Sequence, residues 1–253
     1  MKTSPRWLRT GALLAALTLG GALHAQEIVV SAAASLTNAF QAVGQAFEKS
    51  HPGAKVTFNF AASGALLAQM QQGAPVDVFA SADQETMNRA ATAQLLADGS
   101  RADFVQNTLV LIVPAAATTT PQKLEELTGA AYKRISTGTP TSVPVGRYTM
   151  DAVQQAGLAA ALEPKWIYGE SVRQVLNYVA RGEVDAGFVY RTDALIEREK
   201  TRIALTVPTA KPVSYPIAVL AGSKNATTAR DFVAFVRSEP GQQVLGGFGF
   251  SKP

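Results

Sequence analysis

Strand-like apolar runs alternate with amphipathic helical stretches along almost the whole chain, and this alternation constrains the fold more than any other feature. Such alternation favours an α/β architecture, with mixed, mostly parallel sheets flanked by helices. The first helical stretch illustrates the pattern, because its apolar residues recur at steps of three and four. These residues are Leu36, Ala39, Phe40, Val43 and Phe47.

The same patterns predict where the individual elements lie. We expect strands over 27–32, 55–60, 76–80, 108–113, 134–136, 166–168, 185–190, 203–207 and 215–221. We expect helices over 36–50, 65–72, 84–91, 147–156, 172–181 and 226–238. The chain is long enough for one large domain or two small ones, and no flexible linker separates two halves.

The first 25 residues have the features of a secretory signal peptide. Lys2, Arg6 and Arg9 precede an apolar run over 11–23 that is too short to anchor the chain in a bilayer, and Ala25 marks the expected cleavage point. Without this segment 20 basic residues remain against 19 acidic ones, so the formal net charge falls from +4 to about +1. The chain contains no cysteine. We therefore predict a soluble periplasmic monomer with no nucleic-acid partner, no membrane-embedded segment and no lipid anchor.

Two similar turns place a serine where a strand gives way to a helix. "SAAASLTNAF" contains Ser35 and "FNFAASGALL" contains Ser63, and alanines precede the serine in both. Serine is a favoured helix N-cap, so each residue is explained in part by capping its own helix. However, both turns lie at strand carboxyl ends, where α/β proteins collect ligands, and neither contains a charged residue. An anion at these turns would be held by N–H and O–H donors alone.

Six segments in order along the chain resemble the molybdate-binding periplasmic proteins of ABC importers, which have the two-lobed type II periplasmic binding protein fold. The segments are "AAASLTNAF", "FAASGAL", "GAPVDVFASADQ", "VPVGRYT", "ESVRQVLNYVARGEVDAGFVY" and "YPIAVLAGSKN". The resemblance implies that a tetrahedral dianion binds between two lobes through neutral donors. Ser35 and Ser63 would each offer a hydroxyl and an amide, Val145 and Val172 a backbone N–H, and Tyr190 its phenol.

The resemblance also implies the domain plan and the partners. Lobe 1 would comprise 26–106 and 214–253, lobe 2 would comprise 107–213, and the hinge would lie at the two crossings. The ligand would be molybdate or tungstate, with no cofactor and no cation-binding metal site. The protein would deliver this ligand to a membrane permease with its cytoplasmic ATPase.

The chain departs from the family pattern at a few positions. Val145 stands where relatives often have alanine, although the amide donor survives that change, and Ala62 and Gly64 stand where many have serine. Asp77 and Asp83 are interpreted as local turn and cap residues rather than metal ligands, because no histidine or cysteine stands near them.

Other functions remain open from the sequence. Arg147 and Arg173 adjoin the implicated amides and would suit a small carboxylate, and sulfate or another oxyanion carries suitable charge. An enzyme is not expected, because only His51 remains after signal cleavage and no G-x-S-x-G, dinucleotide-binding or P-loop motif is present.

Overall fold

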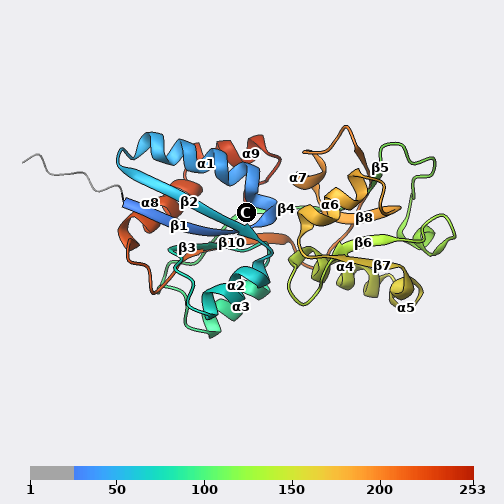
Figure 1. The fold of residues 1–253 in the computed structure, drawn as a ribbon, viewed down its shortest axis with the longest axis horizontal. Helices are drawn as coiled ribbons and strands as arrows, with labels where there is room; N and C mark the ends of the chain where they lie inside the picture. The colour runs from blue at the N-terminus through green and yellow to red at the C-terminus, as the bar shows by residue number, and fades with distance from the viewer. Residues whose placement is uncertain (1–25) are drawn as a thin grey trace, which may run out of the picture.

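Two five-stranded sheets lie side by side in the computed structural model, which describes residues 26–253 (Figure 1). The sheet that contains the N-terminal strand, with its helices, is called lobe 1, and the other sheet with its helices is called lobe 2. The predicted signal peptide, residues 1–25, lies outside the described residues. Within 26–253, every helix is too short or too polar to cross a bilayer.

Both sheets have the same arrangement of strands. Lobe 1 has the order β2-β1-β3-β10-β4, and lobe 2 has the order β7-β6-β8-β5-β9. The strands of lobe 1 are β1 (Gln26–Ala33), β2 (Ala54–Ala61), β3 (Val78–Ala80), β4 (Ala102–Asn107) and β10 (Val213–Val219). Those of lobe 2 are β5 (Leu109–Pro114), β6 (Ile135–Gly138), β7 (Trp166–Gly169), β8 (Ala186–Tyr190) and β9 (Thr201–Thr206).

One strand in each sheet runs against the others. In lobe 1, β1 pairs in parallel with β2 and β3, while β10 is antiparallel to both β3 and β4. In lobe 2, β6 pairs in parallel with β7 and β8, while β5 is antiparallel to both β8 and β9. The predicted mixed, mostly parallel α/β fold is therefore confirmed.

Helices cover both faces of each sheet (Figure 1). In lobe 1, α1 (Thr37–Ser50), α8 (Ala226–Arg237) and α9 (Glu239–Gly247) cover one face, and α2 (Ser63–Gln71) and α3 (Gln84–Thr92) cover the other. In lobe 2, α6 (Val172–Ala180) and α7 (Arg191–Ala194) lie opposite α4 (Pro144–Gln155) and α5 (Ala159–Leu162). Short 3-10 turns complete the chain: η1 (Ala34–Leu36), η2 (Leu124–Thr128) and η3 (Glu163–Lys165).

The predicted apolar face of the first helix is buried, as its spacing indicates. Phe40 and Phe47 of α1 are both fully buried and meet the ring of Phe232 on α8 edge-on, with ring centroids 6.1 and 5.3 Å apart. Each aromatic pair of this kind contributes about 0.5–1.5 kcal/mol beyond the burial of its area. The helix therefore docks on its sheet through the residues that carry the helical period.

Sequence patterns missed two elements of lobe 1. Strand β4 is an edge strand with a mixed polar sequence, held by backbone pairing with β10 more than a hundred residues away. Helix α9 contains Pro240 and three glycines, which are poor helix formers. It forms because Pro240 lies in its first turn and Ser238 caps its N-terminus. Gly241 has to be a glycine because a Cβ there would lie 2.1 Å from the Phe235 carbonyl oxygen.

Candidate functional site

A small cavity lies where the carboxyl ends of strands from both sheets meet. Its volume is about 10 Å³, far below the roughly 300–1,000 Å³ of pockets for drug-sized ligands. No charged side chain lines it, and its walls are Ala33, Ala34, Ser35, Ala62, Ser63, Ala82, Val143, Pro144, Val145, Val172 and Tyr190. The cavity therefore suits a small ligand that is recognised by neutral groups.

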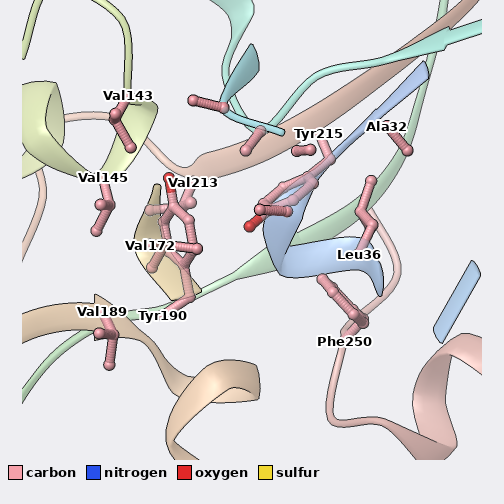
Figure 2. Packing of buried hydrophobic residues seen from close by; sticks show 14 of the residues in the cluster. Ala32, Leu36, Val143, Val145, Val172, Val189, Tyr190, Val213, Tyr215 and Phe250 are labelled. Atoms are coloured by element: carbon pink, nitrogen blue, oxygen red, sulfur yellow. The ribbon is translucent and has the colours of Figure 1, made fainter. Parts of the chain in front are cut away.

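All five residues predicted for the site line this cavity. Ser35 lies in η1 after β1, and Ser63 is the first residue of α2 after β2. Val145 and Val172 lie in the first turns of α4 and α6, and Tyr190 ends β8. Each residue is at most 4% exposed, so all five lie in the interior of the protein. Figure 2 shows Tyr190 beside Val145 and Val172, with Tyr215 close by.

Neither serine caps its own helix, so the capping interpretation is wrong. The first turns of η1, α1 and α2 have no side-chain cap. Instead, Ser35 Oγ lies 2.9 Å from the Tyr215 hydroxyl, and Ser63 Oγ accepts a 3.0 Å hydrogen bond from the backbone N–H of Ala82. Because its oxygen already accepts from an amide, the Ser63 hydroxyl keeps its proton for the cavity.

Tyr190 brings an unpartnered hydroxyl to the cavity. Its side chain is 1% exposed, and its oxygen has no hydrogen-bond partner in the protein. Burial raises the pKa of Tyr190 well above its ordinary value, so the phenol stays protonated and able to donate at neutral pH. A buried hydroxyl without a partner is costly, and an acceptor atom in the cavity would satisfy it.

Helix starts supply further donors. The first-turn amides of a helix have no acceptor within the helix, and the aligned peptide dipoles add partial positive charge there. The N-termini of α2, α4 and α6 all place first-turn residues in the cavity wall. These amides, the serine hydroxyls and the Tyr190 phenol form a set of neutral donors for an anion rich in acceptor atoms.

The two arginines beside the site turn away from the cavity. Arg147 binds Asp83 in lobe 1, with Nη2 2.7 Å from Oδ2. Arg173 donates from Nε to Asp193 at 2.6 Å and from Nη1 to Asn38 in lobe 1 at 2.8 Å. Burial raises the pKa of Asp193, and its ion pair with Arg173 opposes this shift. Neither guanidinium lines the cavity, so the arrangement does not favour a carboxylate clamp.

Asp77 and Asp83 both have structural roles. Asp83 caps α3 by accepting from the Thr86 amide at 3.1 Å, as expected. Asp77 lies in a bend just before β3, and its carboxylate accepts from the Val29 amide at 2.8 Å and the Ser223 hydroxyl at 2.5 Å. Asp77 therefore ties β1 to a loop far along the chain.

The two lobes are in direct contact around the cavity. The Gly64 amide in lobe 1 donates to the Ser142 carbonyl in lobe 2 at 2.9 Å, and the two arginines bridge the lobes on either side. These contacts require the closed arrangement of the lobes. Arg173 also donates from Nη2 to the Ser35 backbone carbonyl at 3.3 Å, so one bridge reaches a residue of the cavity wall.

Removing one bridge is expected to weaken ligand binding without destabilising the ligand-free protein. Asn38→Ala deletes the acceptor for Arg173 Nη1, a contact made only when the lobes are closed. The loss of one hydrogen bond, about 0.5–1.5 kcal/mol, corresponds to roughly a two- to tenfold loss of affinity. Calorimetric titration and thermal unfolding check the two parts, and a lower melting temperature with unchanged affinity would contradict the role in closure.

Sequence patterns missed the groups that hold the serines. Tyr215 was expected only as the start of a strand, and the Ala82 amide carried no signal in the sequence. Tyr215 lies in β10 and Ala82 lies just after β3, two strands whose positions depend on pairing within the sheet. Tyr215 begins the segment "YPIAVLAGSKN" that carries part of the family resemblance, but nothing in the sequence indicated that its hydroxyl reaches Ser35.

Comparisons with known proteins agree with this geometry. The family described as bacterial extracellular solute-binding protein matches residues 28–251. The molybdate-binding protein ModA of Haemophilus influenzae is 34% identical over 248 residues, covering 96% of this chain and 97% of its own. A solved substrate-binding domain assigned to a molybdenum ABC transporter of Clostridium difficile is 35% identical, with a TM-score of 0.69, covering 90% of this chain and 99% of its own.

A more distant structure shows the fold alone. The sulfate-binding protein SubI of Mycobacterium tuberculosis superposes with a TM-score of 0.80 at 19% identity, covering 89% of this chain and 86% of its own. A fold shared at this identity does not carry a ligand with it. Choice of ligand therefore depends on the cavity and on the relatives of higher identity.

Proposed function

This chain belongs to the bacterial extracellular solute-binding proteins, the family matched over residues 28–251, and from that membership we propose that it captures molybdate and delivers it to an ABC importer. The Haemophilus influenzae relative is a molybdate-binding protein, and the Clostridium difficile domain is assigned to a molybdenum ABC transporter. Both are more than 30% identical over most of their length. Capture for transport, without catalysis, is the role consistent with the family.

One observation carries the proposal: a buried cavity between the lobes is lined only by uncharged groups, among them an unpartnered phenol. Hydroxyls and amides of Ser35 and Ser63, the amides of Val145 and Val172, and the Tyr190 phenol would donate to the oxygens of the anion. Hydrogen bonds to a charged group contribute about 1.5–3 kcal/mol each. About seven of them exceed ~10 kcal/mol before desolvation and closure, so submicromolar affinity is expected.

A cavity of donors selects ligands by their protons. Hydrogen phosphate carries an O–H that needs an acceptor, and a buried O–H without one is costly. Molybdate and tungstate at neutral pH carry no proton and have similar sizes, so we propose that both bind. Sulfate has suitable charge, and only its smaller size would distinguish it from molybdate.

The lobes and the location of the protein complete the proposal. Lobe 1 would comprise 26–106 and 214–253, and lobe 2 would comprise 107–213, which agrees with the strands that share each sheet. Opening about crossings near Thr108 and just before β10 would admit the anion. After export by its signal peptide, the monomeric protein would act in the periplasm and pass its ligand to the permease and its ATPase.

Molybdate is expected to raise the melting temperature strongly, whereas phosphate at the same concentration is not. A ligand that binds only the native state stabilises it by RT ln(1 + [L]/Kd), about 4 kcal/mol at a thousandfold excess over Kd. Thermal unfolding with molybdate, tungstate, sulfate and phosphate measures the ranking. An equal shift with phosphate would reveal an acceptor in the cavity, and a larger shift with sulfate would assign the protein to sulfate.

A further inference from the structure

Ser35 is the end of a chain of hydrogen-bonding groups that begins at the hinge. Its hydroxyl lies 2.9 Å from the hydroxyl of Tyr215, a fully buried residue of β10. The Tyr215 hydroxyl lies 3.4 Å from Nδ2 of Asn107, the last residue of β4 before the chain crosses to lobe 2. Asn107 Nδ2 also donates to Thr192 Oγ1 of lobe 2 at 2.8 Å.

The direction of hydrogen bonding along this chain is set by Asn107. Its Oδ1 accepts from the Thr108 backbone N–H at 2.9 Å, which fixes the amide so that Nδ2 faces Tyr215. An amide nitrogen only donates, so the Tyr215 oxygen accepts from it. The Tyr215 proton then goes to its other partner, Ser35 Oγ. With its oxygen accepting, the Ser35 hydroxyl directs its own proton into the cavity.

The second serine is oriented in the same way by a different group. Ser63 Oγ accepts from the Ala82 backbone N–H, which is also a group that only donates. Both serines thus face the cavity as donors. In each case the cause is a donor on the side away from the cavity: the Tyr215 hydroxyl for Ser35 and the Ala82 amide for Ser63. If the Ser35 oxygen also accepted a proton from a ligand, its own proton would have to turn away from the ligand. Among residues 26–253 Tyr215 is the sole partner of the Ser35 hydroxyl, so this buried proton would lack an acceptor at a cost.

We propose that Tyr215, oriented by Asn107, is a positioning residue that fixes Ser35 as a donor and so favours oxyanions that carry no proton. This inference rests on the proposed function, because it assigns a role behind one of the proposed ligand contacts. Burial raises the pKa of Tyr215 well above its ordinary value, so its hydroxyl keeps its proton at neutral pH.

A double-mutant cycle between Tyr215 and Ser35 tests the proposal. Tyr215→Phe removes only the hydroxyl, and its ring keeps its contacts with Tyr190 and Phe250, at centroid distances of 5.8 and 5.7 Å. We expect Tyr215→Phe to weaken molybdate binding about two- to tenfold. In the Ser35→Ala background the same change should have almost no effect, because the group through which it acts is gone.

Two further variants make the result specific. Asn107→Ala should also weaken molybdate binding, and the part of this loss that acts through Tyr215 should vanish in the Ser35→Ala background, whereas any part due to the lost hydrogen bond to Thr192 should remain. Tyr132→Phe deletes the hydroxyl of a buried tyrosine in lobe 2 outside the cavity wall and should leave affinity unchanged. Circular dichroism and thermal unfolding of each ligand-free variant identify any that fails to fold, and Asn107→Ala then carries the test.

The outcomes separate this inference from the function on which it rests. If Ser35→Ala itself leaves molybdate binding unchanged, the proposed site is wrong. If Ser35→Ala weakens binding but the effect of Tyr215→Phe is absent or simply adds to it, the site stands and the positioning role of Tyr215 is refuted. A loss of affinity that Tyr215→Phe causes only when Ser35 is present supports the positioning role of Tyr215, since a packing defect would lower affinity in both backgrounds.

Discussion

The double variant Ser35→Ala/Ser63→Ala is expected to bind molybdate at least about 100-fold more weakly than the wild-type protein. Each substitution removes one hydroxyl from the cavity wall, where the anion would accept a charge-assisted hydrogen bond. Such a bond contributes about 1.5–3 kcal/mol, so each single variant should lose at least about tenfold. Isothermal titration calorimetry of both single variants and the double variant measures these losses.

Ser31→Ala is the matched control for this prediction. Ser31 is a buried serine of the same strand that leads to Ser35, but it does not line the cavity and its hydroxyl has no partner. Its removal should leave affinity unchanged and should not lower the melting temperature. Neither serine of the cavity caps a helix, so their variants should also keep the fold. Unchanged affinity in the double variant would remove both serines from the site.

Local patterns predicted the parts of the site that each strand–helix unit builds for itself. Ser35 and Ser63 could be found because strand, alanines and serine follow one another in the sequence, and parallel strands bring their carboxyl ends to one edge. Val145, Val172 and Tyr190 were found only through the family resemblance, since a valine amide or a strand-end tyrosine has no signature of its own. The structure brings all five to one cavity.

The parts that could not be predicted depend on contacts between distant segments. Strand β4 forms by pairing with β10, and the Tyr215 hydroxyl reaches Ser35 across 180 positions of sequence. The arginines show the same limit, because their nearness to the implicated amides was evident but the direction of their side chains was not. Arg147 and Arg173 turn toward Asp83 and Asn38 in the opposite lobe, which changes their role from ligand clamp to closure contact.

Closure also depends on a residue without a side chain. Gly64, in the first turn of α2, donates to the Ser142 carbonyl across the lobe boundary, and a Cβ at this position would lie 2.6 Å from that oxygen. Real Cβ atoms do not approach other atoms this closely. The atoms of Ser142 that would be struck are backbone atoms and cannot rotate away, so the lobes would have to move apart. Gly64 therefore allows a closer approach of the lobes than any residue with a side chain would.

Gly64→Ala is accordingly expected to weaken molybdate binding at least about fivefold, because overpacking costs about 1–3 kcal/mol and falls on the closed form alone. The ligand-free protein should be as stable or up to about 1 kcal/mol more stable, since alanine is the better helix former. Gly246→Ala is the matched control: this helical glycine of α9 has open space around it, so the same gain in stability should come without a loss of affinity. Calorimetry measures the affinity of the two variants for molybdate, and thermal unfolding measures the stability of their ligand-free forms. Equal affinity in both would show that the lobes grip the anion without the Gly64–Ser142 contact, whereas opposite changes in stability and affinity for Gly64→Ala alone would identify this contact as part of closure.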